Sequence, residues 1–240
     1  MFSSEFDQLV HQRRSNRNFD PQIEVPNEVI QRSLERAILS PNSSNMQLWE
    51  FYWVKDEEKI KELANYCLGQ SAAKTAKHLV IFVGRQDLWK VRAKHNLEQI
   101  QNQKNNTTPK RLKRGLQYYG KLMPLLYSQD PIGIMTLVRK SLSFFMGISK
   151  PFMRLSGKAD QRVMVQKSCA LAAQTFMLSI TAEGFDTCPM EGFDKNRVKK
   201  MLNLPAGAEI NMIIAVGKGT AEGVYGERYR LPYEEVVFEV

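Results

Sequence analysis

Arginine side chains gather near the start of the chain. Arg13, Arg14 and Arg17 surround Ser15 in the run VHQRRSNRNF. Guanidinium groups are permanently charged and bind phosphate oxygens in pairs, and a neighbouring hydroxyl can complete such a site. This first segment therefore predicts a binding site for a phosphate ester.

A second segment, residues 41–49, carries amides and hydroxyls in the sequence PNSSNMQLW. Asn42, Asn45 and Gln47 each offer donors and acceptors, which suits a heteroaromatic ring edge that alternates C=O and N–H groups. A nucleotide with such a ring would fit both segments, so we expect them to form one site. Neither segment is a strict motif, and a solvated helix end followed by an ordinary turn would have the same composition.

Three stretches of the chain are more specific together than any one alone. The pattern R-R-S-x-R-x-F-x-P runs from Arg13 to Pro21, and P-x-S-x-N-x-Q-x-W runs from Pro41 to Trp49. Residues 183–194, EGFDTCPMEGFD, are similar to a third pattern, G-L-x-x-x-P-x-x-G-F-D. In this order the stretches resemble the FMN-dependent nitroreductase family, over roughly residues 5–84 and 160–240.

The resemblance implies which residues would bind the phosphate and ribityl chain of FMN. These are Arg13, Ser15 and Arg17, with Arg14 as a substitute. Arg228 or Arg230, near the end of the chain, would close the phosphate site, and Arg228 is slightly favoured.

The resemblance also implies contacts to the isoalloxazine ring. The loop would supply Pro41, Asn42, Ser43, Asn45 and Gln47. The other face of the ring would be covered by Pro189, Met190, Glu191 and Gly192. A backbone N–H of Glu191 or Gly192 would donate toward N5, so Glu191 is not expected to be an acid catalyst. Gln70, or the cationic Lys74, would donate toward N1 and O2 and stabilise the reduced ring.

The activity implied by the resemblance is hydride transfer. NAD(P)H would reduce the flavin, and an electron-poor acceptor such as a nitroaromatic or quinone would then be reduced by a ping-pong mechanism. No catalytic side chain is expected, and three isolated histidines predict no metal site. The alternatives are a relative that fragments flavin or removes halogen reductively, and a flavin-binding or membrane-surface protein without turnover.

Positive charge is concentrated in the middle of the chain. The net charge is +9, but residues 85–162 hold 16 Lys or Arg against four Asp or Glu and so carry +12. A solvated basic face, attraction of a phosphorylated nicotinamide cofactor, or peripheral contact with an anionic membrane would each explain this segment. A nucleic-acid module is disfavoured because few aromatic side chains are interleaved with the charges.

Periodicity predicts the elements that position these residues. A short helix is expected to start with a capping box from Ser4 to Asp7. A second helix is expected to start at Pro26 and to bury Ile30, Leu34, Ala37 and Ile38. Further helices are expected at residues 57–66, over most of 86–128, and at 161–183. The expected strands are residues 50–54, 78–84 and 210–216. The alternation favours an α/β or α+β fold, and the resemblance selects α+β with a central, mostly antiparallel sheet.

We expect one domain over residues 1–240, with residues 85–160 as a basic helical insertion or lid. Residues 131–151 are apolar, but Arg139 and Lys140 interrupt them before they reach the length of a spanning helix. They are expected to form a lid, a dimer-packing arm or an interfacial segment.

The resemblance further implies a domain-exchanged homodimer. The helix 161–183 would pack at a two-fold interface, the active sites would be shared between subunits, and the arm 229–240 would reach the partner chain. Three unpaired cysteines and no early apolar signal segment predict a cytoplasmic protein.

Overall fold

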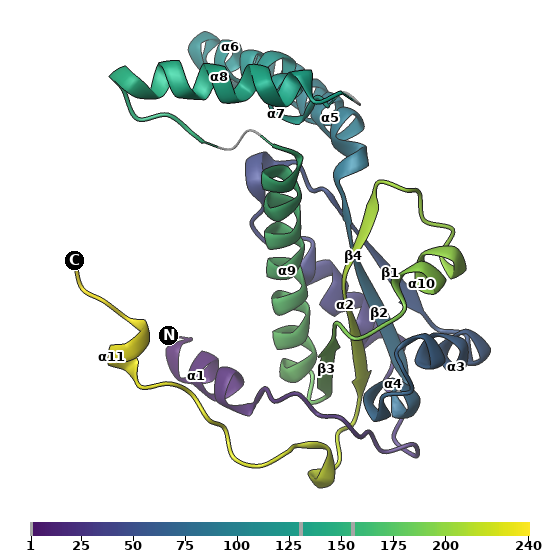
Figure 1. The fold of residues 1–240 in the computed structure, drawn as a ribbon. Helices are drawn as coiled ribbons and strands as arrows, with labels where there is room; N and C mark the ends of the chain where they lie inside the picture. The colour runs from purple at the N-terminus through teal and green to yellow at the C-terminus, as the bar shows by residue number, and fades with distance from the viewer. Residues whose placement is uncertain (1, 130–131, 155–156) are drawn as a thin grey trace.

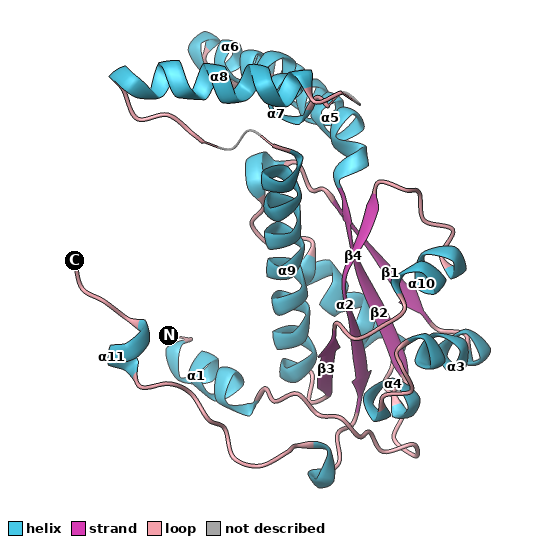
Figure 2. Cartoon of the chain, in the orientation of Figure 1, coloured by secondary structure: helices cyan, strands magenta, loops and turns pink. Residues whose placement is uncertain are grey.

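The computed structural model describes residues 2–129, 132–154 and 157–240 (Figure 1). Its strands form an antiparallel sheet in the order β1-β2-β4-β3 (Figure 2). Their bounds are β1 Trp49–Val54, β2 His78–Arg85, β3 Asp186–Met190 and β4 Ala208–Gly217. Three strands match the expected ones. β3 was not expected; it is an edge strand that pairs only with β4, which is where a residue such as Pro189 is tolerated.

Helices account for most of the remaining chain. They are α1 Ser3–Gln12, α2 Asn27–Ala37, α3 Glu57–Tyr66, α4 Ser71–Thr75, α5 Trp89–Asn102, α6 Pro109–Gln117, α7 Met123–Tyr127, α8 Ile134–Ser149, α9 Lys158–Ala182, α10 Lys195–Met201 and α11 Tyr233–Val236. An antiparallel sheet surrounded by helices is an α+β fold, as expected.

The helices α9 and α2 cover one face of the sheet. Cys169, Ala172 and Phe176 of α9 are completely buried and pack with Phe82 and Ile214 of the strands. By length and composition α9 would suffice to cross a membrane, but here half of its most apolar stretch is buried inside the fold. The prediction of a central helix is therefore confirmed.

The opposite face of the sheet is covered by α3, α4 and α10 (Figure 1). Leu63, Ala73 and Val198 come from these three helices and are completely buried against the strands. Asp56 caps α3 by accepting a hydrogen bond from the Lys59 backbone N–H at 2.9 Å. Helices packed on both faces of the sheet hold its strands in position, and the candidate site residues lie at the ends of these strands.

The helices α5 to α8 lie beyond one end of the sheet, and α1 and α11 lie toward the other (Figure 1). A separate apolar cluster joins these helices to the body of the fold. In it Met123 and Tyr127 of α7 pack with Met46 and with Met164 of α9. The basic residues of the middle segment are thus anchored next to the loop that begins at residue 41.

Two local predictions were wrong. Ser4 does not form a capping box with Asp7, since its hydroxyl donates to Glu5 at 3.0 Å and α1 starts after Phe2 without a side-chain cap. Ile38 is 52% exposed because α2 ends at Ala37, one residue before it could join the buried stripe.

Buried His78 predicts a dependence of stability on pH. Trp53 Nε1 donates to His78 Nδ1 at 3.2 Å, so the proton of the neutral ring lies on Nε2, which donates to the Val25 carbonyl at 2.9 Å. Burial lowers the pKa of His78, although the bond to Val25 opposes this. The unfolded chain takes up this proton near pH 6.5 and the folded chain only below it, so protonation favours unfolding.

We therefore expect the free energy of unfolding to fall as the pH drops below about 6.5. Urea unfolding between pH 5 and pH 8, for the wild type and for His78→Gln, would measure this contribution. The variant has no titrating ring at this position, so its profile should be flatter than that of the wild type. Parallel profiles would contradict the assignment.

Candidate functional site

The arginine segment lies between β3 and the C-terminal part of the chain. Ser15 pairs with Thr187 of β3, and the Asn16 N–H donates to the Thr187 carbonyl at 3.1 Å. On the other side the Arg17 N–H donates to the Gly223 carbonyl at 2.7 Å. The fold thus brings the first and third resemblance stretches into direct contact.

Four guanidinium groups converge in this region. Burial lowers the pKa of Arg13 most, and the positive charges of Arg228, Arg230 and Arg14 lower it further. The Arg13 side chain is half-buried and makes no hydrogen bond to any of the described residues. A half-buried, unpaired cation among other cations is an arrangement that an anion would stabilise.

Arg228 has a structural role that the sequence did not reveal. Its guanidinium donates to three backbone carbonyls at the end of α1, those of Val10 at 3.2 Å, His11 at 2.9 Å and Arg13 at 2.6 Å. These contacts satisfy carbonyls that the end of a helix leaves without partners. These bonds use both hydrogens of Nη2 and one of Nη1, so a phosphate would have to bind the remaining N–H groups; that Arg228 closes a phosphate site stays a prediction.

The remaining arginines differ in how far their guanidinium groups are already engaged by other residues. Arg14 donates to the Gly226 carbonyl at 2.9 Å, and Arg230 donates to its neighbour Tyr229 at 2.6 Å. Arg17 is exposed and lies over the ring of Tyr225, 4.7 Å from its centroid. Arg13 and Arg17 are thus the arginines most available to a ligand.

Thr187 and Cys188 are consecutive residues of β3, so their side chains point to opposite faces of the sheet, and Cys188 is the one near Arg17 and Arg13. Thr187 Oγ1 is buried and has no hydrogen-bond partner among the described residues. Burial raises the pKa of the Cys188 thiol, although Arg17 and Arg13 act in the opposite direction. Thr187 is completely buried, so its hydroxyl is enclosed by the protein.

The stretch after β3 ends in two free backbone donors. Pro189 and Met190 still pair with β4, whereas Glu191 and Gly192 are exposed and lie past the last pair. Their N–H groups take part in none of the hydrogen bonds of the described chain. They are therefore available, as expected, to donate to a ring that lies on this stretch.

Gln70 contacts this stretch, but not in the expected way. Its Nε2 donates to the Gly192 carbonyl at 2.7 Å and to the Cys67 carbonyl at 3.0 Å. Both amide hydrogens are thus used, and only Oε1 remains, as an acceptor. The expectation that Gln70 donates to a ligand is corrected.

Lys74 lies close to Gly69, the residue before Gln70. Its Nζ lies close to Gly69, where an added Cβ would come within 3.2 Å of it. Gly69 has a φ of +66°, so a side chain there would be strained as well as crowded. The glycine leaves room for the ammonium group of Lys74 beside Gln70.

The loop of residues 41–47 has an unusual backbone. Ser44, Asn45 and Gln47 have φ values of 56°, 49° and 47°, in the left-handed region. Asn42 stabilises this shape because its Oδ1 accepts a hydrogen bond from the Gln47 N–H at 2.8 Å. Further support comes from α9, where Ser168 Oγ accepts from the Ser43 N–H at 3.2 Å.

Helices of the middle segment also support this loop. The Tyr118 hydroxyl lies 2.7 Å from Ser44 Oγ, and the Tyr119 hydroxyl donates to the Ser44 carbonyl at 3.0 Å. Asn96 donates to the Asn45 carbonyl at 2.8 Å. The sequence alone did not indicate a role for these three residues, because no local motif marks them and only the fold brings them to the loop.

The loop and the arginines lie at opposite ends of β2. Thr187 pairs with Val216, which pairs with His78 at the start of β2. The loop leads to Leu48, whose carbonyl accepts from the Arg85 N–H at the end of β2. Eight residues of strand separate these ends by roughly 23 Å at about 3.3 Å per residue.

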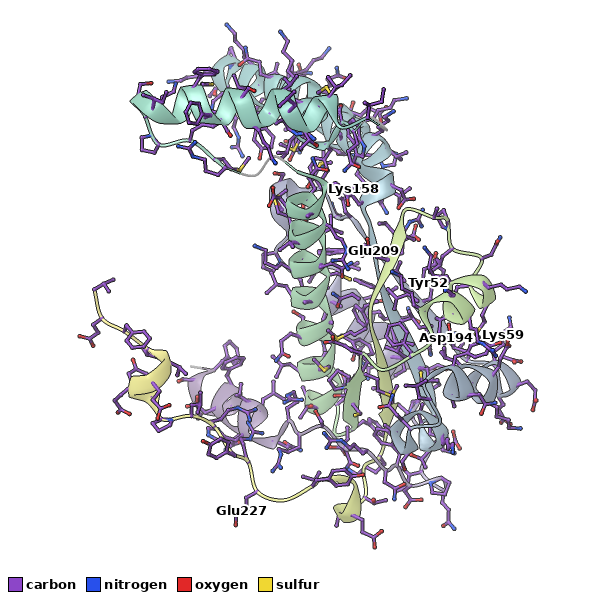
Figure 3. The ribbon with its side chains drawn as sticks, viewed as in Figure 1. Tyr52, Lys59, Lys158, Asp194, Glu209 and Glu227 are labelled. Atoms are coloured by element: carbon purple, nitrogen blue, oxygen red, sulfur yellow. The ribbon has the colours of Figure 1, made fainter. Side chains whose placement is uncertain are left out.

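The two segments therefore do not form one site within a single chain, contrary to the first expectation. Glu227, next to Arg228, and Lys158, at the start of α9, show the same separation along the molecule (Figure 3). The arginines, the stretch after β3, Gln70 and Lys74 make one group. The loop with Tyr118 and Tyr119 makes another.

Known proteins resemble this chain over most of its length. A family model described as the nitroreductase family matches residues 10–218. The Bacillus subtilis protein named "Putative NAD(P)H nitroreductase MhqN" is 28% identical over 237 residues, which is 98% of each chain.

Solved structures resemble the whole chain. The crystal structure of "putative nitroreductase ydfN" from Bacillus subtilis has a TM-score of 0.75 at 25% identity and covers 99% of both chains. A "putative nitroreductase in complex with FMN" from Exiguobacterium sibiricum has a TM-score of 0.67 at 20% identity, and the match covers 98% of this chain and 97% of that one.

Proposed function

Because this chain belongs to the nitroreductase family, we propose that it is an FMN-dependent oxidoreductase that takes hydride from NAD(P)H and reduces an electron-poor acceptor. The observation that carries the proposal is the half-buried, unpaired Arg13 among three further guanidinium groups. The segment that carries Arg13 meets β3 near its start, and the free N–H groups of Glu191 and Gly192 follow the end of the same strand. A phosphate and a ring edge in one ligand would use both features.

The residues present fit FMN. A phosphate dianion would offset the mutual repulsion of the guanidinium groups. It would bind Arg13 and the exposed Arg17, whose guanidinium lies over Tyr225 and donates a long hydrogen bond to the Ser15 carbonyl at 3.5 Å. The N–H groups of Glu191 and Gly192, with Oε1 of Gln70 and Nζ of Lys74, would meet the polar edge of the ring.

A second copy of the chain would complete this site. The loop of residues 41–47 is too far from Arg13 within one chain, so we propose a homodimer in which each site takes the loop from the partner. Exposed apolar side chains support an interface, since Phe2 of α1 is 86% exposed and Leu171 of α9 is 48% exposed. Residues 229–240 are exposed throughout, including the short helix α11 that interrupts the expected extended arm.

The chemistry of the reaction would come from FMN, which accepts and passes on hydride when it is bound. The protein would bind and orient it through the arginines and backbone donors. Lys74 would hold a positive charge beside the pyrimidine edge, and the helices α5 to α8 would form the lid that limits access to the ring.

We expect Lys74→Met to lower the midpoint potential of the bound flavin by roughly 30 to 60 mV. A cation near the pyrimidine edge favours the more negative, reduced form, and 30 mV in a two-electron couple corresponds to about 1.4 kcal/mol. The potential can be measured by redox titration with reference dyes. Lys59→Met, on α3, removes the same charge outside the site and should leave the potential unchanged; equal potentials for all three proteins would remove Lys74 from this role.

An absorbance spectrum of the purified protein under anaerobic conditions tests the proposed function. A flavin band that bleaches with NADH or NADPH and returns with a quinone or nitroaromatic is the expected result. A band that never bleaches would favour a flavin-binding protein without turnover, and narrow acceptor use would favour a specialised relative. No band after incubation with FMN would overturn the proposal.

A further inference from the structure

We propose that a cavity in the basic helices binds the 2′-phosphate and adenine of NADPH, so that the protein prefers NADPH to NADH. This inference rests on the proposed function, because it identifies the reductant of that site. The cavity has a volume of about 540 Å³ and lies between α5 and α6. Lys110, Arg111 and Arg114 line it with positive charge, and Ile100, Tyr118 and Tyr119 line it with apolar and aromatic surface.

The charged residues of the cavity are suited to a phosphate monoester. No acidic residue lines the cavity, and the side chains of Lys110, Arg111 and Arg114 form no ion pair within the described ranges. A phosphate monoester carries close to two negative charges at neutral pH and offers several acceptor oxygens. Guanidinium forks match those oxygens in geometry as well as in charge. NADH has only a hydroxyl at the corresponding position.

The apolar residues of the cavity are suited to a nucleobase. Tyr118 and Tyr119 meet edge to face, with ring centroids 5.2 Å apart, and Ile100 lies beside them. Gly115 allows α5 and α6 to approach, because an added Cβ would come within 2.9 Å of Ile100 Cγ2. Planar bases stack on aromatic side chains. Cations beside an aromatic surface therefore fit an adenosine 2′-phosphate better than a free inorganic ion.

In the proposed homodimer, the loop connects this cavity to the flavin site that is formed by the arginines of the partner subunit. Tyr118 and Tyr119, which line it, also bind Ser44 in the loop that would contact the ring. One dinucleotide could therefore place its nicotinamide at the flavin while its adenosine end occupies the cavity. The same contacts would let the occupied cavity stabilise the strained loop, whose backbone has several left-handed residues.

A membrane is the competing partner for this segment. Phe144, Phe145 and Ile148 of α8 are 58%, 67% and 71% exposed, and Lys140 and Lys150 are exposed on and beside the same helix. The aromatic lining of the cavity and the absence of acidic residues from its lining favour a nucleotide over a membrane surface. Binding to anionic vesicles is therefore one outcome of the test.

The experiment compares two nucleotides that cannot donate hydride. Adenosine 2′,5′-bisphosphate and 5′-AMP would be titrated into the FMN-loaded protein by calorimetry. We expect the bisphosphate to bind roughly ten- to a hundredfold more tightly, the scale of charged hydrogen bonds to one phosphate. The double variant Arg111→Gln/Arg114→Gln should abolish this difference, whereas the control Lys140→Gln/Lys150→Gln removes the same charge from α8 and should retain it.

The outcomes separate this inference from the proposed function. Two results would overturn the cavity assignment even if the flavin is bleached. One is equal affinity of the wild type for the two nucleotides, and the other is an equal loss of the affinity difference in both double variants. Bisphosphate binding that depends on Arg111 and Arg114, in a protein whose flavin is never bleached, would support the cavity and contradict the proposed function. Binding to vesicles of anionic lipid without discrimination between the nucleotides would assign the basic segment to a membrane instead.

Discussion

Replacing Arg13 with alanine is expected to weaken FMN binding by roughly 1.5 to 3 kcal/mol, or about 10- to 150-fold in Kd. Arg13 is half-buried, its side chain has no hydrogen-bond partner within the described chain, and three other guanidinium groups lower its pKa further. A phosphate would relieve this repulsion and gain charged hydrogen bonds. Arg13→Ala thus removes a guanidinium group that makes no hydrogen bond within the described chain.

Quenching of FMN fluorescence during titration of the apoprotein measures this effect. Lys59→Ala is the control, because Lys59 lies on α3, across the sheet from α1 (Figure 3). Arg228→Ala should behave differently from Arg13→Ala: it leaves three carbonyls at the end of α1 without a partner, so its melting temperature should fall even without FMN. An unchanged affinity in Arg13→Ala would remove that residue from the site.

The sequence was sufficient for elements with strong local signals. All eight residues of β2 are buried, so its apolar run identified it, and Asp56 before α3 is an ordinary helix cap. β3 was missed because its sequence, DTCPM, contains polar residues and a proline. It becomes a strand only by pairing with β4, a contact distant in sequence.

Residue chemistry identified parts of the site but not their arrangement. The types and spacing of the arginines were enough to suggest a phosphate. That Arg228 is engaged by α1, and that Gln70 has used both donors, depends on backbone groups brought together by the fold. The distance between the loop and Arg13 follows from the strand register, which periodicity alone does not determine.

That separation predicts that two defective chains can restore a site together. One chain would carry Arg13→Ala. The other would carry Asn42→Ala, which removes the oxygen that accepts the Gln47 backbone N–H and holds the loop, and Gln47→Ala, which removes an amide expected to contact the ring. If each site takes its arginine from one chain and its loop from the partner, each variant alone should bind FMN poorly. A dimer of the two contains one site in which both parts are intact.

We expect the mixed dimer to bind FMN at about half of its sites with the affinity of the wild type, because a two-fold dimer has two equivalent sites. Two different affinity tags, used in succession after coexpression, would isolate it, and fluorescence titration would count the sites. If arginine and loop acted within one chain, the mixed dimer would have no intact site and would bind as weakly as its parents. The register of β2 argues against a site within one chain, because residue 42 could reach Arg13 of the same chain only if the sheet refolded.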